Sequence, residues 1–164
     1  GSADGSIFKI TSENNIDSTV LVDPVINSGI TYFEVIFRDH EGGQFRMGVA
    51  DAKLSFGAGE APQEYGSIGD LLHIGTTTKG NTKYLCGQRV GVEVDMKSTP
   101  RTVTFFVDDI EQPNRIVGVP AAIRFFAFIS ISNSSFEIKR LKRRFQSSAR
   151  GVKGTRSLEW GKTS

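Results

Sequence analysis

The stretch Ile30-Thr31-Tyr32-Phe33-Glu34-Val35-Ile36-Phe37-Arg38 decides the fold class. In an extended chain, successive side chains point to opposite faces, so Phe33, Val35 and Phe37 share one face. Glu34 falls on the other face. This period-two alternation predicts a half-buried β-strand over residues 30–38.

The same alternation recurs along the chain. It is strong over residues 89–96, 102–107, 123–131 and 136–139, and weaker over 7–11, 19–22, 45–50, 71–75 and 83–85. Apolar residues occupy both faces of 123–131, which predicts a strand in the interior of its sheet. Before residue 139, no stretch shows the apolar stripe of an amphipathic helix. Many short strands separated by turn signals predict an all-β fold, an antiparallel two-sheet sandwich.

Length and charge define the expected domain organisation. The 164 residues fit one domain, and no apolar run approaches the ~20 residues of a membrane-spanning helix. No secretory signal segment is recognisable. From Lys139 onward there are nine basic residues and one acid, whereas the preceding chain is mildly acidic. We expect a β-sandwich domain over residues 1–142, followed by a basic, flexible C-terminal tail or linker over 143–164.

The basic tail has several interpretations, which the sequence leaves open. Its leading cluster consists of Lys139, Arg140, Lys142, Arg143 and Arg144. Such a run can bind nucleic acid or an anionic membrane electrostatically, dock on the acidic body of its own chain, or remain a solvated linker. Trp160, the single tryptophan, is either a short docking motif for a partner or a clip onto the body.

The chain offers little material for catalysis or metal binding. Its one cysteine, Cys86, excludes an internal disulfide framework and fits a reducing, cytoplasmic setting. Neither His40, in a predicted turn, nor His73, in a predicted strand, belongs to a nucleophile–base–carboxylate pattern. We therefore expect no enzymatic activity, no metal and no cofactor, and a binding scaffold instead. A lectin-like sandwich that binds sugar is a weaker alternative.

Four segments, taken in order, resemble motifs of the SPRY domain family over about residues 5–142. They are Gly29-Ile30-Thr31-Tyr32-Phe33-Glu34-Val35, Met47-Gly48-Val49-Ala50, Gly87-Gln88-Arg89-Val90-Gly91-Val92-Glu93-Val94-Asp95 and Thr104-Phe105-Phe106-Val107-Asp108-Asp109. Asp108-Asp109 stands where the family hairpin usually has Asn-Gly, and aspartate tolerates the positive φ of a tight turn. The resemblance implies a bent, jelly-roll-type sandwich of two antiparallel sheets.

The resemblance also implies a function. SPRY domains generally act as non-catalytic protein-interaction modules, often as substrate-recognition parts of ubiquitin ligases or within signalling proteins. They bind a short peptide or loop of a partner through loops at one end of the sandwich. Carried over to this chain, the expected contact residues are Asn27, Ser28, Asp51, Ala52, Lys53, Tyr65, Ser132, Asn133 and Ser134. We expect a monomer with a protein or peptide ligand, and nucleic acid or membrane contacts through the tail only.

Overall fold

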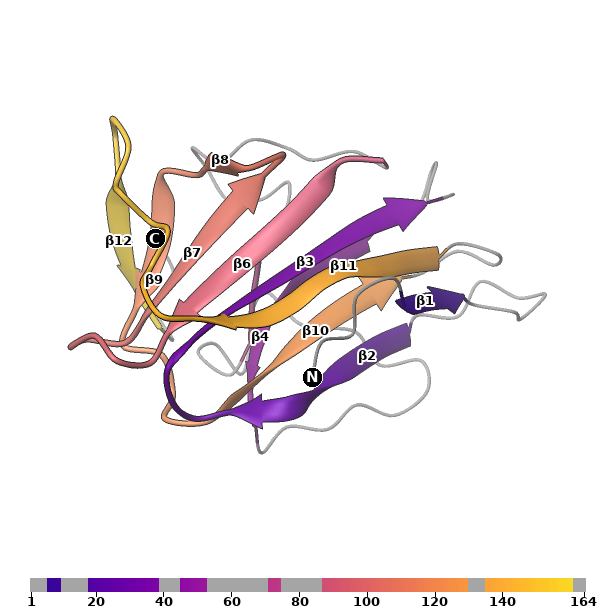
Figure 1. Ribbon diagram of the computed structural model, residues 1–164, viewed down its shortest axis with the longest axis horizontal. Helices are drawn as coiled ribbons and strands as arrows, with labels where there is room; N and C mark the ends of the chain where they lie inside the picture. The colour runs from indigo at the N-terminus through magenta and orange to yellow at the C-terminus, as the bar shows by residue number, and fades with distance from the viewer. Residues whose placement is uncertain are drawn as a thin grey trace.

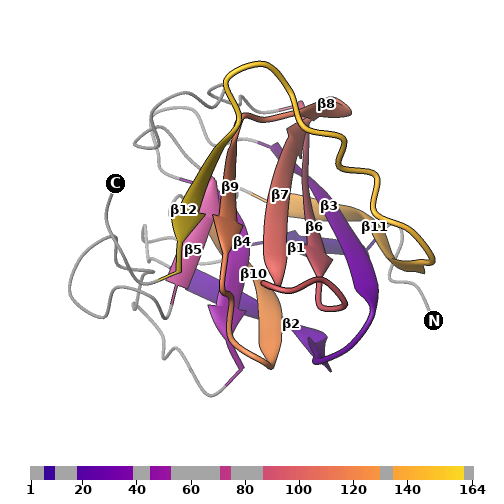
Figure 2. The ribbon, with the colours of Figure 1, turned by 90° about the vertical axis from the view of Figure 1, so that its left-hand side faces the viewer.

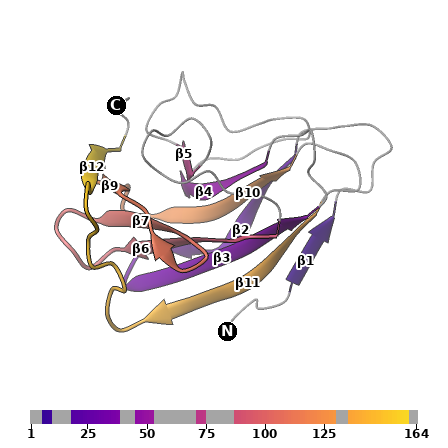
Figure 3. The same ribbon diagram turned by 90° about the horizontal axis from the view of Figure 1, so that it is seen from above.

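The computed structural model describes residues 6–9, 18–38, 45–52, 71–74, 87–129 and 135–160. These residues form β-strands joined by turns and irregular segments, and among them no helix is long and apolar enough to cross a membrane. The strands lie in two layers, seen edge-on in Figure 3 and labelled in Figure 1. The all-β, two-sheet sandwich predicted from the sequence is confirmed.

The larger layer is an eight-stranded sheet. Its strands are, in spatial order, β1 (Ser6–Lys9), β11 (Ser135–Arg144), β3 (Ile30–Arg38), β6 (Arg89–Asp95), β7 (Thr102–Val107), β9 (Asn114–Val117) and β12 (Arg156–Glu159), and β8 (Ile110–Glu111) pairs with β7. β3 lies between β11 and β6, and its Phe33, Val35 and Phe37 are fully buried in the core, as their alternation predicts.

The smaller layer is a four-stranded antiparallel sheet. Its order is β2 (Ser18–Ile26), β10 (Ile123–Ile129), β4 (Phe45–Asp51) and β5 (Leu71–Ile74). The interior position predicted for residues 123–131 is confirmed, because β10 lies between β2 and β4. Phe125 and Phe126, on opposite faces of β10, are both fully buried. The Phe125 ring stacks on Phe33 of the larger sheet at a centroid distance of 4.8 Å, which joins the two layers. The strand predicted over 83–85 lies outside the described residues.

The turn between β7 and β8 is a two-residue hairpin. Val107 pairs with Ile110, and the intervening Asp108 and Asp109 have φ angles of 49° and 68°. Two successive positive φ angles match the right-handed twist of a hairpin. The side chains contribute as well, because Arg89 donates from its backbone N–H to Asp108 at 2.9 Å and from its guanidinium to Asp109 at 2.6 Å. The tight turn expected at this aspartate pair is confirmed.

Residues 143–160 differ from the flexible tail or linker that the sequence predicts. Arg143 and Arg144 complete β11, where they pair with the first residues of β3. Residues 145–160, here called the C-terminal strap, then run past β8 to the far edge of the larger sheet (Figure 2). The strap ends in β12, which pairs with β9 in parallel. Of the interpretations left open for the tail, the structure shows docking on its own body. Residues 161–164 lie outside the described part of the chain.

Backbone hydrogen bonds and one partly buried ring hold the strap in place. The Glu111 carboxylate accepts hydrogen bonds from the backbone N–H groups of Arg150 at 2.7 Å and Gly151 at 2.9 Å. At the end of β12, the Trp160 N–H donates to the Val117 carbonyl at 2.9 Å. The Trp160 side chain packs against the hydrophobic core. Trp160 is therefore a clip onto the body, one of the two roles that the sequence allowed.

Candidate functional site

Four of the predicted contact residues come together at one end of the sandwich. Asn27 and Ser28 form the turn from β2 to β3, and Asp51 and Ala52 end β4. β10 connects the two pairs, because its Ile123 pairs with Ile26 on one side and with Asp51 on the other. Neighbouring strands lie about 4.8 Å apart, so the two pairs are roughly 10 Å apart.

The remaining predicted contact residues lie outside the described part of the chain. They are Lys53, Tyr65, Ser132, Asn133 and Ser134. The strand residues that flank 132–134 belong to the opposite end of the sandwich. Ile129 pairs with Phe45 at the start of β4, and Ser135 pairs with Arg38 at the end of β3. The structure therefore brings Asn27 and Ser28 together with Asp51 and Ala52, but not with these flanking residues.

Arg124 fixes the end of β4 at this face. Its guanidinium lies 3.2 Å from the Asp23 carboxylate of β2 and 3.4 Å from the Ala52 carbonyl. The Ala52 N–H donates to the Ala122 carbonyl at 3.0 Å. These contacts tie β2, β10 and β4 together, so the backbone beside the candidate site is well supported.

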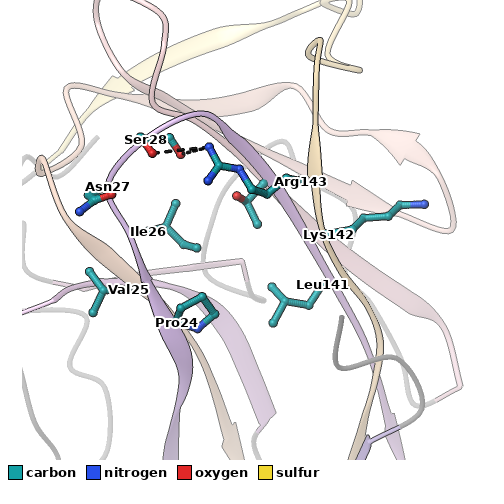
Figure 4. A pocket seen from close by; sticks show the side chains of 9 residues that line it. Pro24, Val25, Ile26, Asn27, Ser28, Leu141, Lys142 and Arg143 are labelled. Carbon is teal, nitrogen blue, oxygen red and sulfur yellow. Dashed lines mark hydrogen bonds between the residues drawn. The ribbon is translucent and has the colours of Figure 1, made fainter. Parts of the chain in front are cut away.

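A cavity of about 170 Å³ opens beside Asn27 and Ser28, between the two sheets. It is lined by Pro24, Val25, Ile26, Asn27, Ser28, Thr31, Leu141, Lys142 and Arg143. β2 and the following turn supply one wall, and β11 supplies the facing wall (Figure 4). The lining combines an apolar base, made by Pro24, Ile26 and Leu141, with polar groups from Ser28 and Arg143.

Thr31 belongs to this lining, and its hydroxyl oxygen is buried without a hydrogen-bond partner among the described residues. The residue is 3% exposed, and its Oγ1 forms no hydrogen bond within the structure. A buried hydroxyl without a partner costs about 1–3 kcal/mol. Thr31 lies on the same face of β3 as Phe33, where the alternation would place an apolar side chain. A ligand that supplied an acceptor or donor here would remove that cost.

Arg143 borders the cavity without a carboxylate partner among the described residues, whereas the side chain of Lys142 points away from it (Figure 4). Arg143 donates weakly to the Ser28 carbonyl and Oγ, at 3.3 and 3.5 Å, as Figure 4 shows. Gly29, with φ +72°, leaves room for this approach, because a Cβ there would overlap the guanidinium. Neither Arg143 nor Lys142 forms an ion pair within the described part of the chain. The cavity is therefore positively charged at its rim.

The other residues of the predicted electrostatic cluster face acids. Along β11, Lys139 lies 3.5 Å from Glu137, Arg140 lies 3.9 Å from Glu34, and Arg144 lies 3.1 Å from Glu93. Glu34 and Glu93 are only 1% exposed, whereas the side chain of Arg140 is 43% exposed and that of Arg144 is 23% exposed. Three of the five predicted basic residues thus have an acidic partner, and Arg143 is the cation that points to the cavity.

Glu93 is the centre of a buried polar cluster on the outer face of the larger sheet. It accepts hydrogen bonds from Arg144 Nη1 at 3.1 Å, from Ser148 Oγ at 2.6 Å and N–H at 3.0 Å, and from Ser147 Oγ. Burial by itself raises the pKa of a carboxyl, but the hydrogen bonds from Ser147, Ser148 and Arg144 outweigh it and hold the pKa of Glu93 below its usual value.

Tyr32 connects this cluster to Glu34. Burial, reinforced by the Glu34 carboxylate, raises the pKa of the Tyr32 hydroxyl far above its usual value, so it stays protonated. It donates to Glu34 Oε2 at 2.8 Å. The Arg144 guanidinium lies 4.1 Å from the centre of the Tyr32 ring, and the Phe106 ring meets it edge-on at 5.8 Å. Tyr32 therefore contacts both Arg144, the last residue of β11, and the buried carboxylate of Glu34.

The lowered pKa of Glu93 predicts acid-sensitive docking of the strap. A carboxyl whose pKa is lower in the folded state stabilises the fold above its unfolded-state pKa of about 4.3, and that stabilisation is lost as the pH falls through the folded-state pKa. We expect hydrogen exchange of residues 145–160 to accelerate below about pH 4 relative to β3, after correction for intrinsic rates. Equal acceleration of β3 and the strap would contradict this assignment.

Comparisons with known proteins support the fold. No family model matches the chain, and no curated protein sequence matches it. Among solved structures, the chain is similar to the SPRY domain of human HERC1, with a TM-score of 0.59 and 13% sequence identity. The match covers 80% of this chain and 87% of that domain. The chain thus has a SPRY-like β-sandwich fold.

Proposed function

We propose that this chain is a non-catalytic protein-interaction module that binds a short acidic peptide or loop in the cavity beside Asn27 and Ser28. The lining supports this most directly, because apolar side chains and the Arg143 guanidinium border one cavity, and the hydroxyl of Thr31 lies just behind its wall without a partner among the described residues. The SPRY-like fold supports an interaction role in general. Among the described residues, no group of three or more His, Cys, Asp or Glu could hold a metal ion.

The cavity suggests a two-part mode of binding. One apolar side chain of the ligand fills the space between Ile26 and Leu141, where its burial supplies most of the affinity. A carboxylate or carbonyl next to it accepts hydrogen bonds from Thr31 Oγ1 and Arg143. Arg143 favours ligands with additional acidic residues through charge complementarity. Asp51 and Ala52 border the path of a ligand that extends toward β4.

Peptide selection followed by substitution in the cavity tests this function. Peptides enriched from a random library should carry acidic residues and should bind Thr31→Val about 3–10-fold more weakly, the effect of one lost hydrogen bond. Arg143→Gln should weaken binding about 10–100-fold, because that hydrogen bond is charge-assisted.

Lys153→Gln makes the same change of charge on the exposed part of the strap and should leave the affinity unchanged. If no peptide is enriched, or if enriched peptides bind both cavity variants as tightly as the parent chain, the proposed function is wrong. Binding of single-stranded RNA that requires Arg143, with no peptide binding, would instead favour the nucleic-acid alternative.

The same proposal includes a cellular role for the module. A module of this kind would recognise substrates for a ubiquitin ligase or partners for a signalling protein, in the cytoplasm and as a monomer. This cellular role is testable, because a partner that binds the basic cavity should present an exposed acidic segment. Calcium-dependent sugar binding would point instead to a lectin-like role.

A further inference from the structure

Two adjacent serines hold the start of the C-terminal strap against a buried acid. The hydroxyls of Ser147 and Ser148 both donate to the Glu93 carboxylate, and the Ser148 N–H also donates to it. Glu93 is 1% exposed, so water does not replace these donors while the strap is in place. The contact therefore depends on both hydroxyls keeping their protons.

Two arginines precede these serines in sequence, and the residues between them and Ser147 are exposed. Arg143 and Arg144 precede Ser147 by four and three residues. The intervening Phe145 is 97% exposed and Gln146 is exposed, whereas the serines themselves are half-buried. Protein kinases select substrates partly by charge pattern, and a pair of arginines before a serine suits a kinase with an acidic peptide site.

We propose that Ser147 and Ser148 are a phosphorylation site whose modification detaches the C-terminal strap. In the reaction, the serine Oγ forms a bond to the γ-phosphorus of Mg-ATP, the bond to the β,γ-bridging oxygen breaks, ADP leaves, and the hydroxyl proton is released. The site loses a donor to Glu93 and gains a group with a charge of about −1.5 to −2.

The buried carboxylate gives this modification its effect. Arg144 provides one positive charge at the site, which is not enough to neutralise both Glu93 and a phosphate. Because Glu93 is held by β6 inside the sheet, the strap is the partner that moves away. Its release withdraws Trp160 from the core and uncovers the outer face around Tyr32 and Glu93.

Trp160, the only tryptophan, makes the release directly measurable. Ser147→Glu and Ser148→Glu should shift its fluorescence to the red. They should also speed hydrogen exchange in residues 145–160 by about tenfold or more, the change produced by ~1.4 kcal/mol of lost docking. Ser157→Glu is the matched control, because Ser157 accepts a hydrogen bond from Arg115 at 2.8 Å and an acid there keeps a positive partner.

Variants made in the Glu93→Gln protein isolate the role of the Glu93 charge. In Glu93→Gln, where the negative charge is absent, Ser147→Glu should add much less release than it does in the parent chain. If Ser147→Glu has the same effect in both backgrounds, or if Ser157→Glu releases the strap equally well, repulsion from Glu93 is not the cause and the proposal is overturned.

Direct modification of the full chain completes the test. An arginine-directed serine kinase with Mg-ATP should place phosphate on Ser147 or Ser148 in the folded protein, as mapped by mass spectrometry, and the modified chain should show exposed Trp160. The proposal fails if a peptide of residues 140–151 is phosphorylated but the folded chain is not. It fails equally if the phosphorylated chain retains the Trp160 emission of the unmodified one.

Discussion

Replacing Glu93 by alanine is expected to lower the free energy of unfolding by about 3 kcal/mol and to free the C-terminal strap. The substitution leaves the guanidinium of Arg144 without its carboxylate and removes the shared acceptor of Ser147 and Ser148. Removing one partner of a buried ion pair typically costs about 3–5 kcal/mol. The lower end applies here, because the Arg144 side chain is 23% exposed and can turn toward water.

Urea unfolding with two probes checks this prediction. Trp160 fluorescence should report an earlier transition in Glu93→Ala than far-ultraviolet circular dichroism, because the strap separates before the sheets unfold. Glu137→Ala is the control. Glu137 pairs with the half-exposed Arg38 and Lys139, and such pairs contribute about 0–1 kcal/mol. A Glu93→Ala protein as stable as the Glu137→Ala protein, with both probes coincident, would show that Glu93 does not hold the strap.

The strands of the core were predictable, because their signal is local. β3 was predicted with the bounds that it has, and the interior position of β10 followed from apolar residues on both of its faces. Alternation identifies a strand when one of its faces is buried, because apolar residues then recur at every second position. β9 and β12 gave no such signal, because their sequences, Asn114-Arg115-Ile116-Val117 and Arg156-Ser157-Leu158-Glu159, do not alternate apolar with polar residues.

The docked strap was harder to predict, because its partners are distant in sequence. A run of basic residues is usually solvated, and nothing near Arg144 in the sequence identifies Glu93 as its partner. The available signal was in β6, where Glu93 lies within the apolar segment from Val90 to Val94. A carboxylate buried at that position requires a cation and hydrogen-bond donors, and the C-terminal segment supplies both.

The candidate site was predictable in part. Asn27 and Ser28 were expected at a binding surface, and they border the cavity. Leu141 and Arg143 were not assigned to it, because a space between two sheets depends on how the layers pack. Thr31 did offer a signal, since it interrupts the apolar face shared with Phe33. A polar residue at a strand position where the alternation predicts a core-facing apolar side chain is a candidate ligand contact.

Replacing Gly91 by alanine is expected to destabilise the protein by about 3 kcal/mol. A Cβ at this position would lie 2.6 Å from Tyr32 Cζ and 2.9 Å from Cε2, closer than van der Waals contact allows. Tyr32 is 3% exposed and is held by Glu34, Arg144 and Phe106, so its ring has little freedom to move. Thermal and urea unfolding of the variant would measure the loss.

Two further variants separate overlap with the ring from loss of the glycine. Gly118 has φ +75° and open space around it, so Gly118→Ala carries backbone strain alone, about 1–2 kcal/mol. Tyr32→Leu removes the ring atoms that the new Cβ would meet, and in that background Gly91→Ala should cost well under 1 kcal/mol. An undiminished cost in the Tyr32→Leu background would show that Gly91 is required for another reason.

The contact between Gly91 and Tyr32 also explains why two separate sequence motifs occur together. The segment Gly29–Val35 contains Tyr32, and the segment Gly87–Asp95 contains Gly91. Because Gly91 has no side chain, the Tyr32 ring packs directly against its backbone. With the ring in place, its hydroxyl reaches Glu34 and its face receives Arg144. Gly91→Ala should therefore weaken strap docking as well as global stability, and the emission of Trp160 should shift to the red before the core unfolds. An unchanged Trp160 signal up to the global transition would mean that the strap is held independently of the Tyr32 ring.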